Sequence, residues 1–446
     1  MSTRSHWPSA PHLVIATFGS LGDLHPYLAI AQAWQARGGR ATVATSSYYR
    51  DVVEDAGIGF RAIRPDLPNP SQNAEFYHRV LDPLRGGARF LLQETIGKYL
   101  RESYDDLFAA THDADILLSH SMCVVAPLVA ARRAFDSQKP MRWVSGVVSP
   151  MFLQSELDPP SLPFVPQLAN APIVGKYATR AWNAWLRRWL LAPLSEVENL
   201  RRDLRLPPGA HPLFGGAHSP HRVLALWSPE FAPPQRDWPS QARAVGFCSF
   251  DRAQKASVQE KFDASSTRLD EFLACGKAPM LFTLGASSAL DAGNFWHENI
   301  AAVKMLHRRA IFAVGRPESD WPDVLHNLQP HILALPYVPL SRVLPRCEAV
   351  VHHGGIGTIA QALCAAIPMI IMPHSQDQPD NAQRAQKIGV ARLIGKRNYH
   401  VSRVVHELQV LTTDPRYTRR VRQVSACMAR ERGAQTAGDW LERELR

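Results

Sequence analysis

Short apolar runs alternate with stretches of helical spacing along most of the chain. Each run is bounded by polar or turn-forming residues, which is the profile of a buried strand. The expected strands cover residues 13–17, 41–44, 60–63, 116–118, 280–284, 309–314, 332–335, 349–351 and 369–372. Helical spacing follows Pro26 and recurs over 48–56 and 358–366. Strands that alternate with helices in this way predict a doubly wound α/β fold with parallel sheets.

The clearest strand, turn and helix in succession has three glycines at its turn, Gly354, Gly355 and Gly357. Glycines let backbone N–H groups approach an anion closely, and the N-terminus of the following helix carries partial positive charge. His353 and Thr358 add side-chain donors at the same place. We expect a phosphate or pyrophosphate here, although a purely structural turn has the same pattern.

A second polar group follows the next expected strand, where Asp377 stands beside Gln378. Ligands of open α/β sheets bind at the carboxyl ends of the strands. A carboxylate next to an amide at that edge suits the adjacent hydroxyls of a sugar.

These two groups together resemble a known signature. His353-Gly-Gly355-x-x-Thr358, followed by Pro368, Pro373 and Asp377-Gln378, resembles the donor-binding segment of the family-1 glycosyltransferases. The paired His352-His353 is similar to the bacterial antibiotic and sterol branch of that family. The resemblance implies a GT-B fold, with two Rossmann-like domains facing a cleft, and a sugar taken from a nucleotide diphosphate.

The loop after the first strand carries a carboxylate, Asp23, at the carboxyl end of that strand. Its position suits a general base and equally suits a helix N-cap. Gly19-Ser20-x-Gly22-Asp23-x-x-Pro26 is similar to the loop of the same bacterial transferases, which implies that Asp23 is the base. His25 matches no family pattern and is at most a supporting residue.

The acceptor side is less sharply marked. His120 follows the strand at 116–118 and could contact an acceptor or serve only the structure, while Ser149-Pro150 and 231–239 resemble acceptor loops of bacterial lipid rhamnosyltransferases. An aromatic and basic helix is expected over 174–194, and it either lies on a membrane or acceptor or packs on its own domain. The acceptor candidates are therefore His25, His120 and Ser149.

The resemblance also assigns donor contacts outside the glycine turn. The small residues after the strand at 280–284 would lie near the pyrophosphate, the segment at 337–340 would pack on uracil or thymine, and Gln361 would meet the ribose where the family often has Glu. The expected donor-binding residues are Gly22, Ser287, Val338, His353, Gly355, Gly357, Thr358, Gln361, Asp377 and Gln378.

Composition narrows the class of protein. A chain of 446 residues can hold two ordinary domains. The net charge is +10, but the arginines are scattered and no nucleic-acid-binding motif appears, so nucleic acid is not an expected partner. The six cysteines form no Cys-x-x-Cys pair, and no signal peptide or membrane span is evident. We expect a cytoplasmic protein that could touch the inner membrane face peripherally.

Metal chemistry is not expected. Asp113-Ala-Asp115 imitates a metal-binding Asp-x-Asp pair, but it stands directly before an apolar strand and such pairs are common by chance. The expected metal ligands are none, and the expected co-substrate is a dTDP- or UDP-linked sugar without a further cofactor.

The combined prediction is an inverting, metal-independent glycosyltransferase. Residues 1–240 would bind the acceptor, 241–420 the nucleotide sugar, and 421–446 would return to the first domain. The closest overall resemblance is to rhamnosyltransferases of rhamnolipid synthesis, which implies rhamnose from dTDP-rhamnose and a hydroxy fatty acid acceptor. The alternatives are a UDP-glucose-dependent enzyme for a sterol, carotenoid or polyketide, a non-catalytic sugar-nucleotide binding protein, and an NAD-dependent oxidoreductase. The last lacks the acidic residue expected after the next strand.

Overall fold

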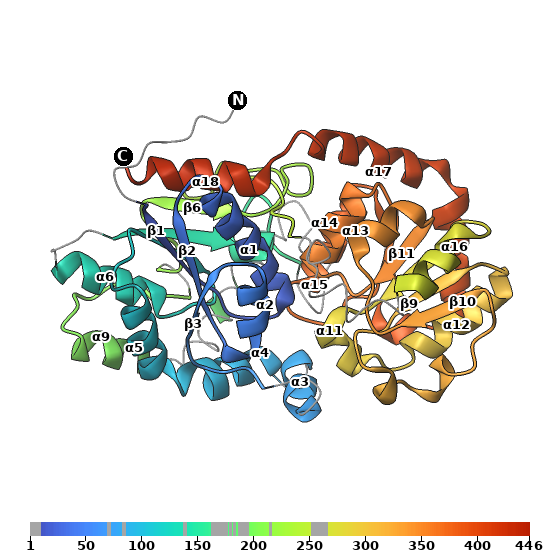
Figure 1. Cartoon of the computed structure of the whole chain (residues 1–446), viewed down its shortest axis with the longest axis horizontal. Helices are drawn as coiled ribbons and strands as arrows, with labels where there is room; N and C mark the ends of the chain where they lie inside the picture. The colour runs from blue at the N-terminus through green and yellow to red at the C-terminus, as the bar shows by residue number, and fades with distance from the viewer. Residues whose placement is uncertain are drawn as a thin grey trace. The chain divides into compact units, whose positions relative to one another are not determined.

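The computed structural model consists of two compact units (Figure 1). It describes residues 10–68, 73–82, 86–136, 141–161, 177, 181, 184–185, 196–213, 216–250 and 266–446. Unit 1 contains residues 1–69, 84–250 and 431–446, and unit 2 contains residues 70–83 and 251–430. The division falls after residue 250, whereas the sequence suggested 240. The segment from 70 to 83 belongs to unit 2, which no sequence pattern indicated.

Unit 1 is built on a parallel sheet with the strand order β3-β2-β1-β4-β5-β6-β7. Its strands are β1 (His12–Ala16), β2 (Arg40–Thr45), β3 (Gly59–Ala62), β4 (Ile116–His120), β5 (Arg142–Val147), β6 (Arg222–Ala225) and β7 (Ala242–Ala244). The central strand β1 pairs with β2 and β4, with Leu13 opposite both Ala41 and Ile116. The strands expected at 13–17, 41–44, 60–63 and 116–118 all lie in this sheet.

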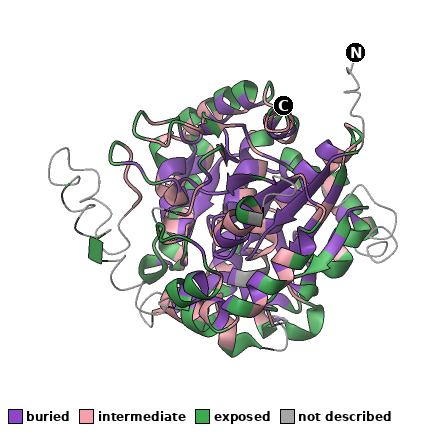
Figure 2. Cartoon of the chain, turned by 90° about the vertical axis from the view of Figure 1, so that its left-hand side faces the viewer, coloured by how far each residue is buried: buried purple, intermediate pink, exposed green. Residues whose placement is uncertain are grey.

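The sheet is buried on both faces, as the colouring of Figure 2 shows. Because side chains alternate along a strand, Leu13 and Ile15 join the apolar cluster on one face, while Val14 and Ala16 join the cluster on the other. A parallel sheet covered by helices on both faces explains why these strands are continuous apolar runs.

Helices cover the two faces of this sheet. They are α1 (Leu21–Gln35), α2 (Arg50–Asp55), α4 (Gly87–Phe90), α5 (Leu100–Ala110), α6 (Ala126–Asp136), α9 (Glu196–Asp203) and α18 (Gly433–Arg443), with the π-helix η3 (Leu91–Gly97) and the short turns η1 (Ser47–Tyr49) and η4 (Pro150–Phe152). The last helix, α18, lies beside α1. It buries Ala437 and Leu441 in the apolar cluster that contains Leu13 and Ile15. Its neighbour Glu444 bonds Arg222 of β6 at 2.9 Å.

The first helix begins earlier than the sequence indicated. We expected it after Pro26, but α1 starts at Leu21, and Pro26 lies inside the helix. The reason is the side chain of Ser20, which caps the helix by accepting a hydrogen bond from the N–H of Gly22 at 3.2 Å.

Unit 2 is built on a second parallel sheet, with the order β10-β9-β8-β11-β12-β13. Its strands are β8 (Met280–Thr283), β9 (Ala310–Ala313), β10 (Ile332–Leu335), β11 (Ala349–His352), β12 (Met369–Ile371) and β13 (Ala391–Leu393). Phe282 and Phe312 stack in its core at 4.8 Å between ring centres. The five strands expected in this half all form, and each end lies within one residue of its expected position.

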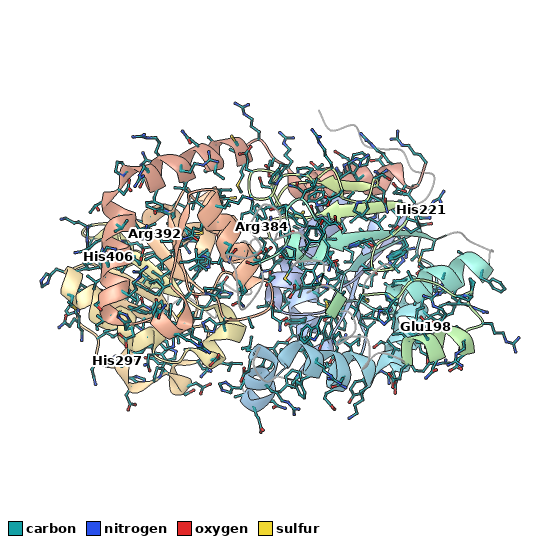
Figure 3. All side chains as sticks on the ribbon, turned by 180° about the vertical axis from the view of Figure 1, so that it is seen from behind. Glu198, His221, His297, Arg384, Arg392 and His406 are labelled. Atoms are coloured by element: carbon teal, nitrogen blue, oxygen red, sulfur yellow. The ribbon has the colours of Figure 1, made fainter. Side chains whose placement is uncertain are left out.

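The helices of unit 2 include the outlying α3. They are α3 (Ala74–Leu81), α11 (Gly285–Ser288), α12 (Phe295–Leu306), α13 (Leu340–Val343), α14 (Ile356–Cys364), α15 (Gln378–Lys387), α16 (Val401–Thr413) and α17 (Pro415–Met428), with turns η7 (Ala289–Asp291), η8 (Glu318–Asp320), η9 (Asp323–Leu325), η10 (Leu344–Arg346) and η11 (Lys396–Asn398). In unit 2 the side chain of Arg392, labelled in Figure 3, bonds Glu407 of α16 and Tyr417 of α17.

Two expectations from the sequence concern segments that the structure describes only in part. The aromatic and basic helix expected over 174–194 lies outside the described residues, apart from four isolated positions. The residue pattern also predicts a helix over 262–274, and the structure describes this segment from residue 266 onward, where it is helical. No helix within the described part of the chain combines the length and apolarity needed to cross a membrane.

Candidate functional site

In unit 1 the candidate base, Asp23, lies in the first turn of α1. It is not the N-cap that we weighed as the alternative, since Ser20 occupies that position. Asp23 Oδ2 accepts hydrogen bonds from the backbone N–H of Ser20 at 2.7 Å and from its hydroxyl at 3.0 Å. The two residues form a capping box, which fixes the carboxylate at the end of the helix.

The loop before α1 is shaped to admit this carboxylate. Gly19 has φ of +133°, and a Cβ placed on it would lie 2.3 Å from Asp23 Oδ2. The carbonyl of Gly19 accepts a hydrogen bond from the hydroxyl of Tyr49 at 3.0 Å. Only glycine fits at this position, because a side chain would displace the carboxylate.

The second oxygen of Asp23 faces a histidine. His120 ends β4, and its Nε2 lies 3.7 Å from Asp23 Oδ1. The ring is 2% exposed, and burial lowers the pKa of His120 below the ordinary value. The imidazole is therefore neutral near pH 7. Sequence reasoning left its role open, and the structure brings it to Asp23.

Asp23 can accept a proton in this arrangement. Its side chain is 29% exposed, so solvent reaches part of it. Oδ2 is occupied by Ser20, whereas the neighbour of Oδ1 among the described side chains is His120. A carboxylate with one oxygen anchored and the other open has the form of a positioned general base.

The other two acceptor candidates are placed differently. His25 lies on α1, two residues beyond Asp23. Its ring packs on Phe250 at 5.4 Å between ring centres. Ser149 is completely buried and is the N-cap of η4, and its acceptor role stays a prediction.

In unit 2 the glycine turn forms as expected between β11 and α14. Gly354 has φ of +92°, and Gly355 is the N-cap of α14 with no side chain to cap the first amides. Gly357 and Thr358 lie in the first turn of the helix, and both are partly exposed. The uncapped amides and the helix dipole together favour an anion at this end of α14.

His353 packs tightly at the same turn. A Cβ on Gly355 would lie 2.5 Å from His353 Nε2, and a Cβ on Gly285 would lie 3.0 Å from its Cε1. The ring is thus held between the turn after β11 and the start of α11. Burial and the neighbouring His352 and His374 lower the pKa of His353 well below the ordinary value, so the ring is neutral.

Two further histidines border this place, and sequence reasoning gave them no role. His352 is fully buried, accepts the N–H of Gly354 at its Nδ1 at 3.1 Å, and has a pKa lowered by burial to about 3. His374 follows β12, and burial lowers its pKa to about 4. The His352-His353 doublet and the histidine after Pro373 were the signals in the sequence.

The pair expected to bind sugar hydroxyls is held by protein contacts. Gln378 Oε1 accepts the N–H groups of His374 and Ser375 at 2.9 and 3.3 Å, and its amide donates to Ser288 at 3.3 Å. Asp377 Oδ2 accepts from the side chain of Asn381 at 2.7 Å.

These contacts connect the turn after β12 to its neighbours. The Asn381 amide also donates to the carbonyl of Gly354 at 3.2 Å, which ties α15 to the glycine turn. Further along α15, Asp380 pairs with Arg384, labelled in Figure 3, at 2.7 Å. These hydrogen bonds therefore hold the turn after β12 in position.

Of the remaining predicted donor residues, Gly22 lies in α1 of unit 1, whereas the other three lie in unit 2. Ser287 lies in α11, directly after β8, although its side chain is outside the described part of the structure. Gln361 is partly buried in α14. Val338 is buried, whereas its neighbour Tyr337 is 39% exposed, so Tyr337 is the residue of this pair with a surface for a base.

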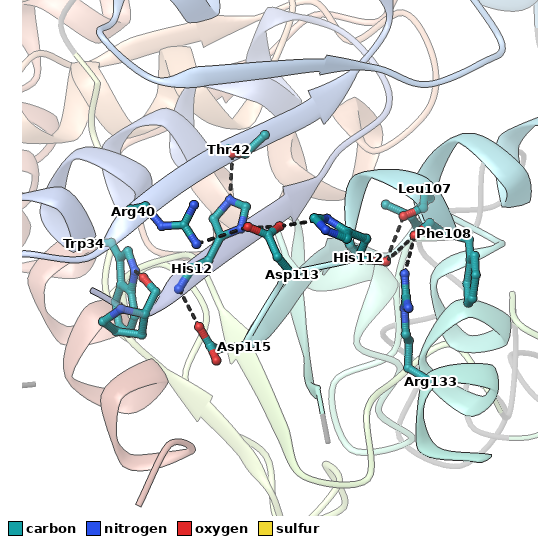
Figure 4. A network of polar contacts seen from close by, with 12 residues as sticks. His12, Trp34, Arg40, Thr42, Leu107, Phe108, His112, Asp113, Asp115 and Arg133 are labelled. Carbon is teal, nitrogen blue, oxygen red and sulfur yellow. Dashed lines mark hydrogen bonds and ion pairs between the residues drawn. The ribbon is translucent and has the colours of Figure 1, made fainter. Parts of the chain in front are cut away.

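The Asp113-x-Asp115 pair has a structural role in unit 1. Asp113 contacts His12 at 3.0 Å and Arg40 at 3.1 Å, and Asp115 accepts the N–H of His12 at 2.7 Å (Figure 4). Both carboxylates lie at the amino end of β1, away from the end where Asp23 lies. They join the starts of β1 and β2 to the segment before β4.

Comparison with known proteins agrees with this arrangement. Residues 310–438 match the family model described as the C-terminal domain of erythromycin biosynthesis protein CIII-like proteins. The chain is similar to O-mycaminosyltylonolide 6-deoxyallosyltransferase of Streptomyces fradiae, with 27% identity over 96% of this chain and 97% of that protein. Over nearly its whole length the chain is thus similar to glycosyltransferases of family 1.

Other relatives of this glycosyltransferase act on sterols. A sterol 3-beta-glucosyltransferase of Komagataella phaffii is 25% identical over 97% of this chain, which spans 34% of that longer protein. Among solved structures, the calicheamicin glycosyltransferase CalG4 has a TM-score of 0.65 at 17% identity, covering 98% of each chain. The glycosyltransferase of kitacinnamycin has a TM-score of 0.64 at 21% identity, covering 99% of this chain and all of that one.

The predicted GT-B fold, with two parallel-sheet α/β domains, is thus confirmed. The predicted enzyme class is confirmed as well, and this glycosyltransferase transfers a sugar from a nucleotide sugar.

Proposed function

We propose that this glycosyltransferase moves rhamnose from dTDP-rhamnose to a hydroxyl of a lipid-like acceptor such as a hydroxy fatty acid, with inversion at the anomeric carbon. Asp23 is the general base in this proposal. The observation that carries this assignment of the base is the carboxylate itself, which Ser20 anchors through Oδ2, while no described residue forms a hydrogen bond with Oδ1.

The proposed reaction is a single displacement. Asp23 Oδ1 takes the proton of the acceptor hydroxyl while that oxygen forms a bond to the anomeric carbon. The bond from this carbon to the diphosphate breaks, and its electron pair leaves with the diphosphate. Negative charge develops there, and the first amides of α14, His353 and Thr358 supply donors that stabilise it. The proposal requires no metal or further cofactor, since these groups meet the charge.

The choice of a 6-deoxy sugar is supported by one relative. The Streptomyces fradiae enzyme is named for the transfer of 6-deoxyallose, which like rhamnose is a 6-deoxyhexose. At the ribose, Gln361 would offer an amide where the family often has a carboxylate, so the contact to the ribose hydroxyls would lack one negative charge. Tyr337, with its exposed ring, is the residue we assign to stacking on thymine.

A second candidate is glucosyl transfer from UDP-glucose to a sterol, carotenoid or polyketide. The sterol 3-beta-glucosyltransferases support this alternative, because they match nearly the whole of this chain. Both candidates use Asp23 in the same way, and they differ only in the nucleotide, the sugar and the acceptor.

Thermal unfolding with added nucleotides tests the donor. A nucleotide at one hundred times its Kd should stabilise the protein by about 2.7 kcal/mol. We expect dTDP and dTDP-rhamnose to raise the Tm more than UDP and UDP-glucose. The opposite order would favour the glucosyl candidate, and no shift with any of the four would contradict the donor site.

The variant Asp23→Asn tests the base in the same preparation. Transfer should fall by roughly 10²–10⁴-fold, because the amide cannot accept the proton. The Tm shift with dTDP should persist, since the proposed donor residues, apart from Gly22, belong to unit 2. Undiminished transfer would show that Asp23 is not the base.

A further inference from the structure

The ring of His120 is held in one orientation from several sides. Its Nδ1 accepts a hydrogen bond from the backbone N–H of Met122 at 3.2 Å. The Tyr27 ring meets it edge-on at 6.0 Å, and the Phe152 ring does so at 6.5 Å. Tyr27 is itself fixed, because its hydroxyl donates to the carbonyl of Gly146 at 2.9 Å. The imidazole has little freedom to turn.

This setting decides where the ring carries its hydrogen. A neutral imidazole has one donor nitrogen and one acceptor nitrogen. Because Nδ1 accepts the Met122 N–H, the hydrogen belongs on Nε2. Nε2 is buried and has no hydrogen-bond partner among the residues that the structure describes, and the charged group that it faces is Asp23, with Oδ1 at 3.7 Å. A small approach would bring the two atoms into a hydrogen bond.

The lone pairs of Asp23 leave room for this bond. An ionised carboxylate offers about four acceptor positions. Ser20 fills two of them at Oδ2, through its N–H and its hydroxyl. If His120 takes one position at Oδ1, one position remains for the hydroxyl of the acceptor.

We propose that His120 is a positioning residue that acts through Asp23, by donating its Nε2 hydrogen to Oδ1 and directing the remaining lone pair toward the acceptor hydroxyl. The proposal rests on the proposed role of Asp23 as the base. His120 does not receive the acceptor proton, because Nε2 already carries a hydrogen and Nδ1 is occupied by a backbone donor. The proton stays on Asp23 until the product leaves.

Two substitutions of His120 test whether the residue donates a hydrogen bond to Asp23 or only fills space in the core. In His120→Gln the carboxamide can still donate to Asp23 and accept from Met122, whereas in His120→Phe a ring remains but the donor is lost. A hydrogen bond to a charged group contributes enough that its loss should lower kcat about 10–100-fold in His120→Phe. His120→Gln should stay within about tenfold of the parent, on the same basis. The KM for the nucleotide sugar should change little in both.

The Asp23→Asn background distinguishes this proposal from that of the base. If His120 acts only through Asp23, adding His120→Phe to Asp23→Asn should cause no further loss, so the two effects should not add. Ser119→Ala provides a control in the same strand, because it removes the partner of the Trp143 indole N–H at 2.9 Å without touching Asp23. This control should lower the Tm and leave kcat unchanged.

Several results would overturn the assignment. A kcat of His120→Phe close to that of the parent would show that no donor is needed. Additive losses in the double variant would show that His120 acts independently of Asp23. Full activity of Asp23→Asn would instead refute the base itself, which is a different outcome from full activity of His120→Phe alone.

Discussion

The two oxygens of Asp23 have different surroundings, and the difference comes from single residues. Ser20 anchors Oδ2, while Oδ1 is left to face His120 and solvent. The sequence offered two interpretations of Asp23, a helix cap or a base. In the structure the residue contributes to capping with one oxygen and keeps the other for chemistry, so these two roles are compatible.

At this scale we predict the effect of Gly19→Ala. The new methyl group would lie only 2.3 Å from Asp23 Oδ2 and would displace it. The backbone would also be strained at φ of +133°. Transfer should fall at least about tenfold, because the displaced carboxylate loses its alignment. The measurement is kcat together with the Tm.

Gly38→Ala is the matched control for that prediction. Gly38 has φ of +92°, but no atom of the described residues lies within 4 Å of the position that a Cβ would take. It should therefore show the destabilisation that comes from backbone strain without the loss of transfer. If both variants lose transfer equally, the contact with Asp23 is not the cause.

At the scale of elements, the carboxyl ends of β8, β11 and β12 position the residues of unit 2. The turn after β11 holds His353 against the start of α11, and Asn381 of α15 bonds the carbonyl of Gly354. Three strand-to-helix turns are thereby joined to one another. Short parallel strands with helices behind them make such an edge rigid, which suits the recognition of a charged group.

Gly355→Ala tests this edge. A methyl group would come within 2.5 Å of His353 Nε2, so the ring would have to leave its present position. We expect the Kd for dTDP to rise about 10–100-fold, corresponding to the loss of one hydrogen bond to a charged group. Isothermal titration measures this directly.

Gly395→Ala is the control, and it should bind dTDP normally. No atom of the described residues lies within 4 Å of the position that a Cβ on Gly395 would take, and its φ is −66°. Unchanged affinity in Gly355→Ala would mean that His353 and the amides of α14 are not the phosphate site.

At the scale of the whole molecule, buried histidines make the stability of the protein depend on pH. Unit 2 buries His352 and His374, and burial lowers their pKa values to about 3 and about 4. Both are neutral in the folded protein between about pH 6.5 and about pH 5, where the unfolded chain binds protons on the same side chains. The unfolded state therefore takes up more protons as the pH falls, and folding becomes less favourable.

We accordingly predict that stability falls between about pH 6.5 and about pH 5, the window below the ordinary histidine pKa and above the two lowered values. Each of these histidines should remove up to about 1.4 kcal/mol per pH unit in this window. Urea unfolding at a series of pH values would show it, and His374→Gln should reduce the slope. A free energy of unfolding that stays constant across this range would contradict the prediction.

Much of the fold was predictable from the sequence. The apolar runs indicated most strands of both sheets because buried parallel strands need nearly continuous apolar residues. The family followed from residues 353–378 because a glycine turn, a helix and a polar pair must occur in a fixed order to bind a nucleotide sugar. The start of α1 was missed since Ser20 caps it, and a cap is a local side-chain contact that hydrophobic spacing does not report.

Only the tertiary structure decided the surroundings of the candidate residues. His120 and Asp23 are far apart in the chain, and they meet because β1 and β4 are neighbours in the sheet. Ser149 proved to be buried and Gln378 proved to be bonded internally, neither of which their residue types reveal. The sequence by itself determined most strands, some of the helices and the chemical groups at their ends, because these depend on local spacing. Which groups face one another depends on strand order and on the direction of each side chain, and packing fixes both.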